Sequence, residues 1–270
     1  MARPLLLCLF LSVMMTAPSG AATASSDTLW TAGGEPVTLH AFGHASLALA
    51  WPDLTVIVDP VGGAARFAAA GRPGVILVTH RHGDHFDPDT IRDLDGDHVA
   101  VITPPDVAES IPSNDPIVMQ NGDAATVHGL RVEAVPAYNR TPGRLDFHPR
   151  GRDNGYVLER GGLRVYISGD TEDIPEMATL GRVDAALLCM NLPFTMSVAQ
   201  AADAARMIGA GVLYPYHYRN RDGSVSDLEE LGRLVASGDG GGDGAGDGAG
   251  AGAPVEIRVL DWYPTDNVKE

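Results

Sequence analysis

The chain has 270 residues and a formal net charge of −16, from 19 basic and 35 acidic residues. Its length suits one large domain, and 44% hydrophobic with 20% charged residues is typical of a folded globular protein. The negative field disfavours nucleic acid and anionic membrane surfaces as partners. An anionic substrate would need local metal ions or arginines, and candidates near the later motifs are Arg140, Arg144, Arg150 and Arg152.

The N-terminal segment has a short cationic start, an apolar run over residues 5–15 and small residues up to Ala24. This order is typical of a secretory signal peptide, and the run is shorter than the ~20 residues that span a bilayer. We therefore expect a signal peptide over 1–24, no stable membrane insertion, and a periplasmic or secreted protein. Removal of Cys8 would leave Cys189, in an apolar run, as a buried thiol without a disulfide partner.

Short β-rich runs follow along the chain. The first three, at 37–40, 46–50 and 54–58, are separated by turn residues and predict an antiparallel meander. Further strands are expected at 74–79, 99–103, 130–135, 156–159, 163–168, 185–189, 212–216 and 256–260.

Two helices are predicted from capping boxes. Ser197 with Gln200 opens one to about 208, and Ser226 with Glu229 opens another to about 236. Many strands with helices mostly between the later ones favour an α/β fold with helices outside a pair of sheets, a four-layer αββα sandwich over residues 25–270. The pattern leaves the strand order open.

Residues 237–254 are almost entirely Gly, Asp and Ala. Such a segment has too little apolar surface to offset the entropy of ordering it, so we expect a flexible surface insertion. A calcium-binding Gly/Asp repeat is disfavoured because it needs an apolar residue in every turn.

Four potential metal ligands follow the predicted strand at 74–79: His80, His82, Asp84 and His85. Three imidazoles and a carboxylate within six positions at a strand end predict a metal site. In such a turn the first two histidines reach one metal, and the Asp and last histidine reach a second.

The His-x-His-x-Asp-His motif after an apolar strand resembles the metallo-β-lactamase superfamily over nearly the whole mature chain. Two later segments are similar to that family too: Gly169-Asp170-Thr171 and Tyr216-His217-Tyr218. The resemblance implies the αββα sandwich and two metal ions. It implies that one metal binds the first two histidines of the motif and a later histidine. The other metal would bind the Asp, the last histidine of the motif and a distant histidine. A further Asp would bridge the two metals. The ligands carried over in this way are His80, His82, Asp84, His85, Asp170 and His217.

The sequence departs from the family pattern where many relatives carry the third histidine of the first site, because Asn139 stands there. A neutral amide is a poor substitute for imidazole on a zinc-like metal. His148, nine positions later, is the candidate replacement, either as a ligand or facing substrate, and a surface histidine is the alternative. Tyr138, Asn139 and Arg140 are candidates to orient the substrate.

The segments Ala-Tyr-Asn at 137–139, His-Pro-x-Gly at 148–151 and Gly-Tyr-Val at 155–157 resemble one branch, the ascorbate-phosphate lactonase-like hydrolases. That wider group includes the phospholipase D that acts on N-acyl ethanolamine lipids. Gly43-His44-Ala45-Ser46 and Asp59-Pro60 are similar to the branch as well. His44 is expected to face substrate, to support a ligand, or to be structural. Asp59 is expected to orient a metal-binding histidine.

These features predict an exported metal-dependent hydrolase that directs a metal-activated hydroxide at a lactone, ester or amide, with Asp84 and Asp170 as the catalytic carboxylates. Imidazole-rich sites suit zinc, and the carboxylates keep manganese or iron possible. One alternative is a phosphodiesterase with the same two metals. Another is a metal-binding protein without turnover, if Asn139 leaves the first site short of a ligand. The substrate is a small molecule, and the sequence leaves the oligomeric state open.

Overall fold

The computed structural model describes residues 25–113, 115–237 and 255–263. The predicted signal peptide and positions 238–254 of the predicted insertion lie outside the described residues. Ser237, expected to open the insertion, is instead the last residue of helix α4 (Leu228–Ser237). Within the described ranges, no helix has the length and hydropathy needed to cross a membrane.

The described residues include fourteen strands, which form two seven-stranded sheets. The first sheet contains, in spatial order, β1 (Ser25–Trp30), β2 (Pro36–Gly43), β3 (Ser46–Ala50), β4 (Thr55–Val58), β5 (Val75–Leu77), β6 (Ala100–Thr103) and β7 (Ile117–Val118). The second contains β14 (Glu256–Ile257), β13 (Val212–Tyr216), β12 (Ala185–Cys189), β11 (Leu163–Ile167), β10 (Asp153–Arg160), β9 (Leu130–Ala137) and β8 (Ala124–Val127).

Strand direction changes within each sheet. β2, β3 and β4 pair antiparallel, which confirms the predicted meander, and β4, β5 and β6 continue in parallel. In the second sheet β8 to β11 pair antiparallel, and β11 to β14 pair in parallel. Parallel neighbours end at the same edge of a sheet, so the loops that follow them meet there.

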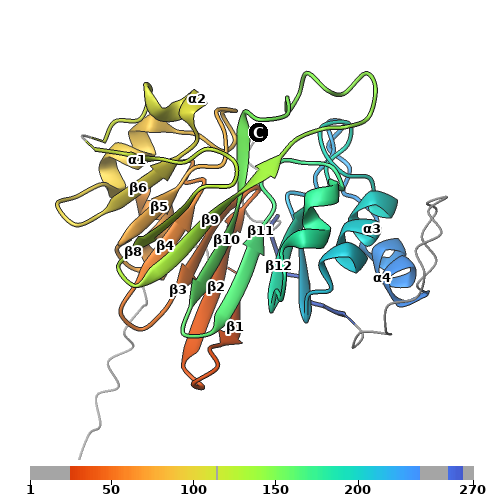
Figure 1. Ribbon diagram of the computed structural model, residues 1–270, viewed down its shortest axis with the longest axis horizontal. Coiled ribbons are helices and arrows are strands. Elements are labelled where there is room, and N and C mark those ends of the chain that lie inside the picture. The colour runs from red at the N-terminus through yellow and green to blue at the C-terminus, as the bar shows by residue number, and fades with distance from the viewer. Residues whose placement is uncertain (1–24, 114, 238–254, 264–270) are drawn as a thin grey trace, which may run out of the picture.

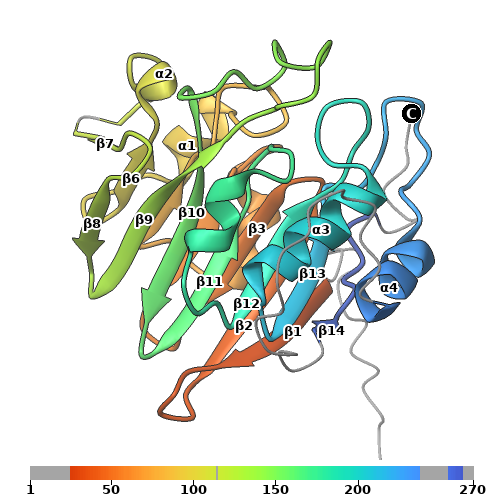
Figure 2. The same cartoon turned by 45° about the vertical axis from the view of Figure 1, so that its right-hand side comes forward.

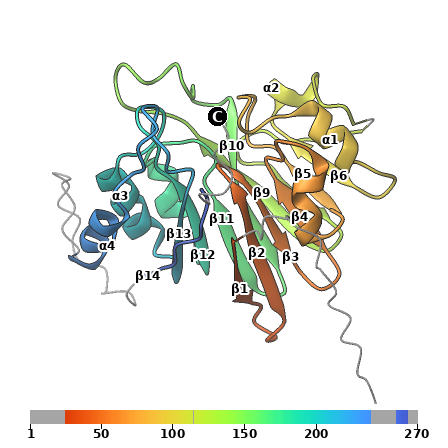
Figure 3. The ribbon, with the colours of Figure 1, turned by 180° about the vertical axis from the view of Figure 1, so that it is seen from behind.

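Helices cover the outer faces of both sheets, as Figures 1, 2 and 3 show. The 3₁₀ helix η1 (Ala64–Ala70), α1 (Pro88–Leu94) and α2 (Pro105–Ala108) lie on the first sheet. The 3₁₀ helix η2 (Pro175–Thr179), α3 (Val198–Ile208) and α4 lie on the second. The four layers are the αββα sandwich that the sequence predicted.

Strand residues alternate between two cores, as the two-residue period of a strand requires. In β3, Leu47 and Leu49 face the main core between the sheets, and Ala48 faces η1. In β5, Leu77 joins the main core, and Ile76 packs against the outer helices. Both faces of these strands are therefore buried, which fits their nearly continuous apolar sequence.

The capping box at Ser197 is confirmed. Its Oγ accepts from the backbone N of Gln200 at 3.2 Å, and the Gln200 Oε1 accepts from the Ser197 N at 3.0 Å. The second predicted box is wrong. The backbone N of Glu230 donates to Asp227 Oδ1 at 2.8 Å, and the buried Ser226 hydroxyl donates to a backbone carbonyl instead. Asp227 caps α4 because the Ser226 hydroxyl is engaged elsewhere and a carboxylate is favoured at the positive end of the helix dipole.

Candidate metal centre

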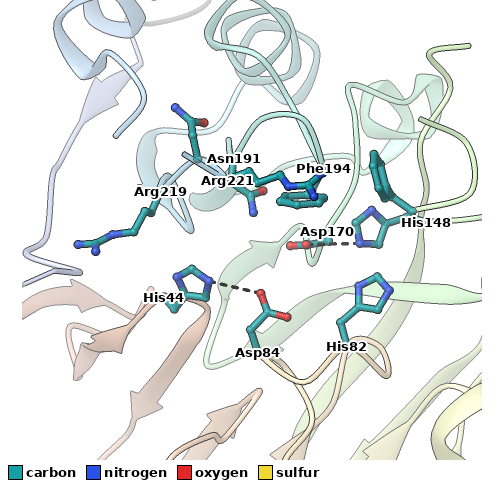
Figure 4. Close-up of a pocket in the computed structure, with 11 residues that line it drawn as sticks. His44, His82, Asp84, His148, Asp170, Asn191, Phe194, Arg219 and Arg221 are labelled. Atoms are coloured by element: carbon teal, nitrogen blue, oxygen red, sulfur yellow. Dashed lines mark ion pairs between the residues drawn. The ribbon is translucent and has the colours of Figure 1, made fainter. Parts of the chain in front are cut away.

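The predicted ligands come together at the edge where parallel strands end. Asp59 follows β4, the histidine motif follows β5, Asp170 follows β11, and His217 follows β13. A cavity of about 500 Å³ opens at this edge. Figure 4 shows its lining: His44, His82, Asp84, Phe147, His148, Asp170, Asn191, Phe194, Arg219, Asn220 and Arg221.

The first cluster consists of His80, His82 and His148, each offering a ring nitrogen within 4.8 Å of the others. The Nε2 of His80 lies 2.9 Å from the Nδ1 of His82. His80 and His148 are buried, and His82 is half-buried on the cavity side. The structure thus places His148 where the sequence lacked a third nitrogen ligand.

The second cluster consists of Asp84, His85 and His217. Asp84 Oδ2 lies 3.4 Å from the Nε2 of His217 and 3.8 Å from the Nε2 of His85. His44 extends this cluster, because its Nε2 is 3.3 Å from the same carboxylate oxygen. The side chains of His44, Asp84 and His217 are close enough together to share one ion.

Asp170 lies between the two clusters. Its Oδ2 is 3.4 Å from the Nε2 of His148, and its Oδ1 is 3.4 Å from the Nε2 of His85 and 3.6 Å from that of His217. One buried carboxylate therefore presents one oxygen to each cluster, which is the placement expected of a bridging ligand.

Three buried polar atoms at this point have no hydrogen-bond partner among the described residues: His85 Nε2, His148 Nε2 and Asp170 Oδ1. A buried polar atom left without a partner costs about 1–3 kcal/mol, so folded proteins rarely keep several together. All three atoms face the clusters, and imidazole with carboxylate is a common donor set for divalent metals. The residues therefore fit two metal ions.

The side chains behind the clusters fix the imidazoles. Asp59, which is buried, accepts from the backbone N and the Oγ1 of Thr79, both at 2.7 Å, and its Oδ2 lies 2.7 Å from His85 Nδ1. The Thr79 Oγ1 is also 3.0 Å from His80 Nδ1. A carboxylate or hydroxyl on the far ring nitrogen orients a metal-binding histidine, so Asp59 occupies the position expected for it.

Burial and the neighbouring charges shift the pKa values of the site. Burial lowers the pKa of His148 to about 4, against the pull of Asp170. Burial raises the pKa of Asp170, but the nearby His217 and His85 outweigh it and hold that pKa well below its usual range. The neutral imidazole and the ionised carboxylate are the forms that bind metal, so both groups are ready for a cation near neutral pH.

Backbone strain is concentrated here. Among the described residues four non-glycine positions have positive φ, and three belong to the site: His44 (55°), Asp59 (48°) and His217 (48°). Gly169 precedes Asp170 with φ 59°, and a Cβ there would lie 2.8 Å from the backbone oxygen of Asn154. Strained positions of this kind persist only where the surrounding packing holds them. The fold therefore holds the ligands in place before any ion binds.

Tyr138, Asn139 and Arg140 do not line the cavity. The Tyr138 hydroxyl donates to Glu176 at 3.0 Å, and Arg140 Nη1 donates to the backbone oxygen of Asp173 at 3.1 Å. Asn139 is buried behind His148. Their placement favours supporting the site loops over binding substrate.

The sequence reasoning missed Asn191, Arg219, Arg221 and Tyr263. Asn191 Nδ2 is 3.3 Å from His217 Nε2, and the Tyr263 hydroxyl is 3.2 Å from His44 Nδ1. Arg219 and Arg221 follow His217 by two and four positions, a proximity that was visible in the sequence. No local pattern marks Tyr263.

The chain is similar to known proteins over most of its length. The family model described as "Beta-lactamase superfamily domain" matches residues 38–217. A protein of Thermococcus onnurineus named UPF0173 metal-dependent hydrolase is 29% identical over 212 residues, covering 74% of this chain and 92% of its own length.

Solved structures give the same result. The crystal structure of a candidate metal-dependent hydrolase from Parabacteroides distasonis shares 36% identity, with a TM-score of 0.75 over 89% of this chain and all of that one. The metallo-β-lactamase fold protein YhfI from Bacillus subtilis, at 12% identity, shares the fold with a TM-score of 0.60 over 80% of this chain and 88% of its own.

Proposed function

The chain belongs to the β-lactamase superfamily and is a metal-dependent hydrolase, and we propose that it cleaves a lactone, ester or amide with two divalent metal ions. The observation that carries the proposal is the single carboxylate of Asp170 facing both ligand clusters. The first ion would be held by His80, His82, His148 and Asp170, and the second by Asp84, His85, His217 and Asp170. Imidazole favours zinc, and the carboxylates are compatible with manganese or iron.

Water is the nucleophile that this cavity favours. Its lining, within the described part of the chain, includes no Ser, Thr, Cys or Lys side chain. Cys189 is buried, and burial raises the pKa of its thiol to about 12. The divalent metal ions that the two clusters would hold would supply hydroxide near neutral pH and polarise the scissile carbonyl.

The two aspartates would have different tasks. Asp170 is buried and fixed between imidazoles, which suits a ligand. The Asp84 side chain is 41% exposed toward the cavity, with His44 3.3 Å and His217 3.4 Å from its Oδ2. A carboxylate that reaches the cavity is placed to accept a proton from the attacking water.

The placement of His148 argues against a metal-binding protein without turnover. That alternative depended on a first site short of a ligand, and His148 supplies a third imidazole there. With the shared carboxylate of Asp170, the first cluster would then offer its ion imidazole and carboxylate ligands, as the second cluster does.

Elemental analysis of protein purified without added metal is the first test, and two equivalents are expected. A panel of 4-nitrophenyl esters, lactones and anilides is then compared with bis-4-nitrophenyl phosphate. Turnover of the carbonyl substrates should disappear in Asp170→Asn and persist in Asp97→Asn, which changes an exposed aspartate away from the cavity. Less than one equivalent of metal, or turnover of the phosphodiester alone, would contradict the proposal.

Export to the periplasm or medium is a further part of the proposal, and it rests on the N-terminal pattern alone. The intact mass of exported protein should correspond to a chain starting near Thr23 or Ser25. Recovery of the chain in a membrane fraction with residues 1–15 still attached would contradict it.

A further inference from the structure

His44 lies in the turn between β2 and β3, and its ring extends to the second ligand cluster. Its φ of 55° is a left-handed conformation, which a non-glycine residue keeps only where its surroundings hold it. Its Nε2 lies 3.3 Å from Asp84 Oδ2, as the dashed line in Figure 4 shows, and its ring centre is 4.2 Å from that of His217. The Nε2 of His44 could therefore bind the second ion or donate a hydrogen bond to Asp84, and the position of the ring hydrogen decides between the two.

Tyr263 contacts the other nitrogen of the His44 ring. Its hydroxyl oxygen is 3.2 Å from His44 Nδ1 and accepts a hydrogen bond from the backbone N of Arg219, also at 3.2 Å. A backbone N–H can only donate, so this bond does not use the hydrogen of the hydroxyl. Among the described residues, His44 Nδ1 is the only acceptor within reach of that hydrogen. The hydrogen bond therefore runs from Tyr263 to His44.

The direction of this bond fixes the tautomer of His44. A neutral imidazole carries one hydrogen, and when one ring nitrogen accepts, the hydrogen is on the other. A second positive charge beside a divalent ion is unfavourable, so the ring is neutral when the cluster holds its metal. The hydrogen is then on Nε2, which donates to Asp84 Oδ2 and has no lone pair left for a metal.

The fold holds Tyr263 in this position. The guanidinium carbon of Arg219 lies 4.3 Å from the centre of its ring, and the ring of Tyr218 packs edge-to-face against it at 5.1 Å. Trp262, which precedes it, is buried. A Cβ at Gly43 would lie 3.2 Å from the backbone oxygen of Trp262, so the glycine lets the β2–β3 turn approach the segment after β14 closely. This close approach brings the tyrosine and the histidine together.

We propose that Tyr263 and His44 are positioning residues that orient Asp84 through two hydrogen bonds of fixed direction, from the Tyr263 hydroxyl to His44 and from His44 Nε2 to the carboxylate. The inference rests on the proposed function, in which Asp84 binds the second ion and accepts a proton from water. The Asp84 side chain is 41% exposed, so packing alone does not fix its rotation. A hydrogen-bond donor behind a metal-binding carboxylate orients it, and its loss typically costs about 10–100-fold in metal affinity or activity.

The tautomer of His44 is measured without reference to turnover. Proton–nitrogen correlation spectra of the histidine rings in zinc-loaded protein distinguish an Nε2–H ring, an Nδ1–H ring and a metal-bound ring, and the His44 signal is the one missing from His44→Gln. We expect the Nε2–H form in the wild type and a loss of this preference in Tyr263→Phe, which removes the hydroxyl and keeps the ring. An Nδ1–H or metal-bound His44 in the wild type would overturn the proposal.

The kinetics show what the two hydrogen bonds do for Asp84. On a 4-nitrophenyl ester, zinc-loaded Tyr263→Phe should have a kcat about tenfold lower and a KM within about twofold of the wild type, because a proton acceptor acts in the transition state. The matched control is Tyr218→Phe, which removes the hydroxyl of the neighbouring ring, 3.4 Å from the Leu260 carbonyl, and should change neither value. An equal fall in kcat for both variants would show a general packing effect and contradict the assignment.

His44→Gln separates a hydrogen-bond donor from a metal ligand. The glutamine amide can place an N–H near the position of Nε2, but a neutral amide is a poor ligand for a zinc-like metal. We expect this variant to retain both metal equivalents against a chromophoric chelator and to keep a higher kcat than His44→Leu. Loss of one equivalent in His44→Gln would make His44 a ligand and overturn the proposal. An Nε2–H His44 in a protein that hydrolyses no ester would keep the hydrogen bonds and remove the hydrolase proposal.

Discussion

Asn139 lies directly behind His148: its Oδ1 is 3.2 Å from the Nδ1 of His148, whose Nε2 faces Asp170. The Asn139 side chain also donates to the backbone oxygens of Arg144 and Phe194, at 3.0 and 2.7 Å. Asn139, which stands where the family pattern has a histidine, is therefore placed to orient His148, the proposed replacement ligand.

Asn139→Ala should therefore weaken the first metal site. Loss of a group that orients a metal-binding imidazole lowers metal affinity by about 10–100-fold. Titration with a chromophoric chelator should show one of two metal equivalents released more easily than in the wild type. His148→Ala should lose the same equivalent more completely. Unchanged retention of both equivalents in His148→Ala would remove His148 from the site.

Arg144 joins the loop that carries His148 to the loop that carries Phe194. Its Nη2 lies 2.5 Å from Glu172 Oε1, and its Nη1 donates to the backbone oxygen of Thr195 at 2.9 Å. The Glu172 side chain is fully buried and that of Arg144 is 17% exposed, so this ion pair is largely removed from water.

Arg144→Met should lower the free energy of unfolding by about 3–5 kcal/mol, because it leaves a buried carboxylate without its cation. The control is Arg150→Met, which breaks a pair with Glu176 on an exposed arginine and should cost less than about 1 kcal/mol. Urea unfolding of the metal-free proteins measures both. A cost for Arg144→Met no larger than that of the control would show that the pair does not hold the loops.

The fold was predictable where its signals are local. The β2–β3–β4 meander and α3 were predicted because turn residues and a capping box mark them within a few positions. Strand β1 was missed because Ser25–Trp30 has no clear alternation, and its strand conformation comes from pairing with β2. Helix α1 was missed, although Asp87 caps it and Pro88 is its first residue. The residues up to Pro88 were interpreted as part of the histidine motif and not as the start of a helix.

The gathering of the candidate ligands at one edge was predictable, because most of them follow predicted strands and parallel strands end at the same edge of a sheet. The Tyr263–His44 contact was not predictable, because the two residues are 219 positions apart and neither has a pattern that points to the other.

Cys189 should not react with thiol reagents in the folded protein. It is buried, and burial, with a further contribution from the Asp170 charge, raises its thiol pKa to about 12. The thiolate is the reactive form, so Ellman's reagent at pH ~8 should label no thiol in native Cys8→Ser protein and one thiol in guanidinium. Rapid native labelling would show that the main core opens at β12.

Asp153, at the start of β10, should contribute less to the free energy of unfolding as the pH rises. An ordinary ion-paired carboxylate contributes more as the pH rises. It is buried, and burial raises its pKa from 3.8 to about 6, although Arg152 donates to both of its oxygens at 2.7 and 2.8 Å. The folded state therefore holds the proton more tightly than the unfolded state. The stabilisation is present below pH 3.8 and is lost as the pH rises through about 6. Two pKa units correspond to roughly 3 kcal/mol.

Asp153→Asn, which stays neutral throughout, should thus gain stability relative to the wild type as the pH rises from ~4 to ~6, with no further change above ~7. Urea unfolding of the metal-free proteins at several pH values gives this difference directly. Asp53→Asn is the control, because Asp53 is exposed and its hydrogen bonds with Arg160 lower its pKa. A lowered pKa favours the charged folded form, so this variant should lose stability relative to the wild type as the pH rises. The stability of Asp153→Asn relative to the wild type could instead stay constant or fall as the pH rises, as is expected for the control. Either result would show that Asp153 is ionised in the folded protein because its ion pair with Arg152 outweighs burial.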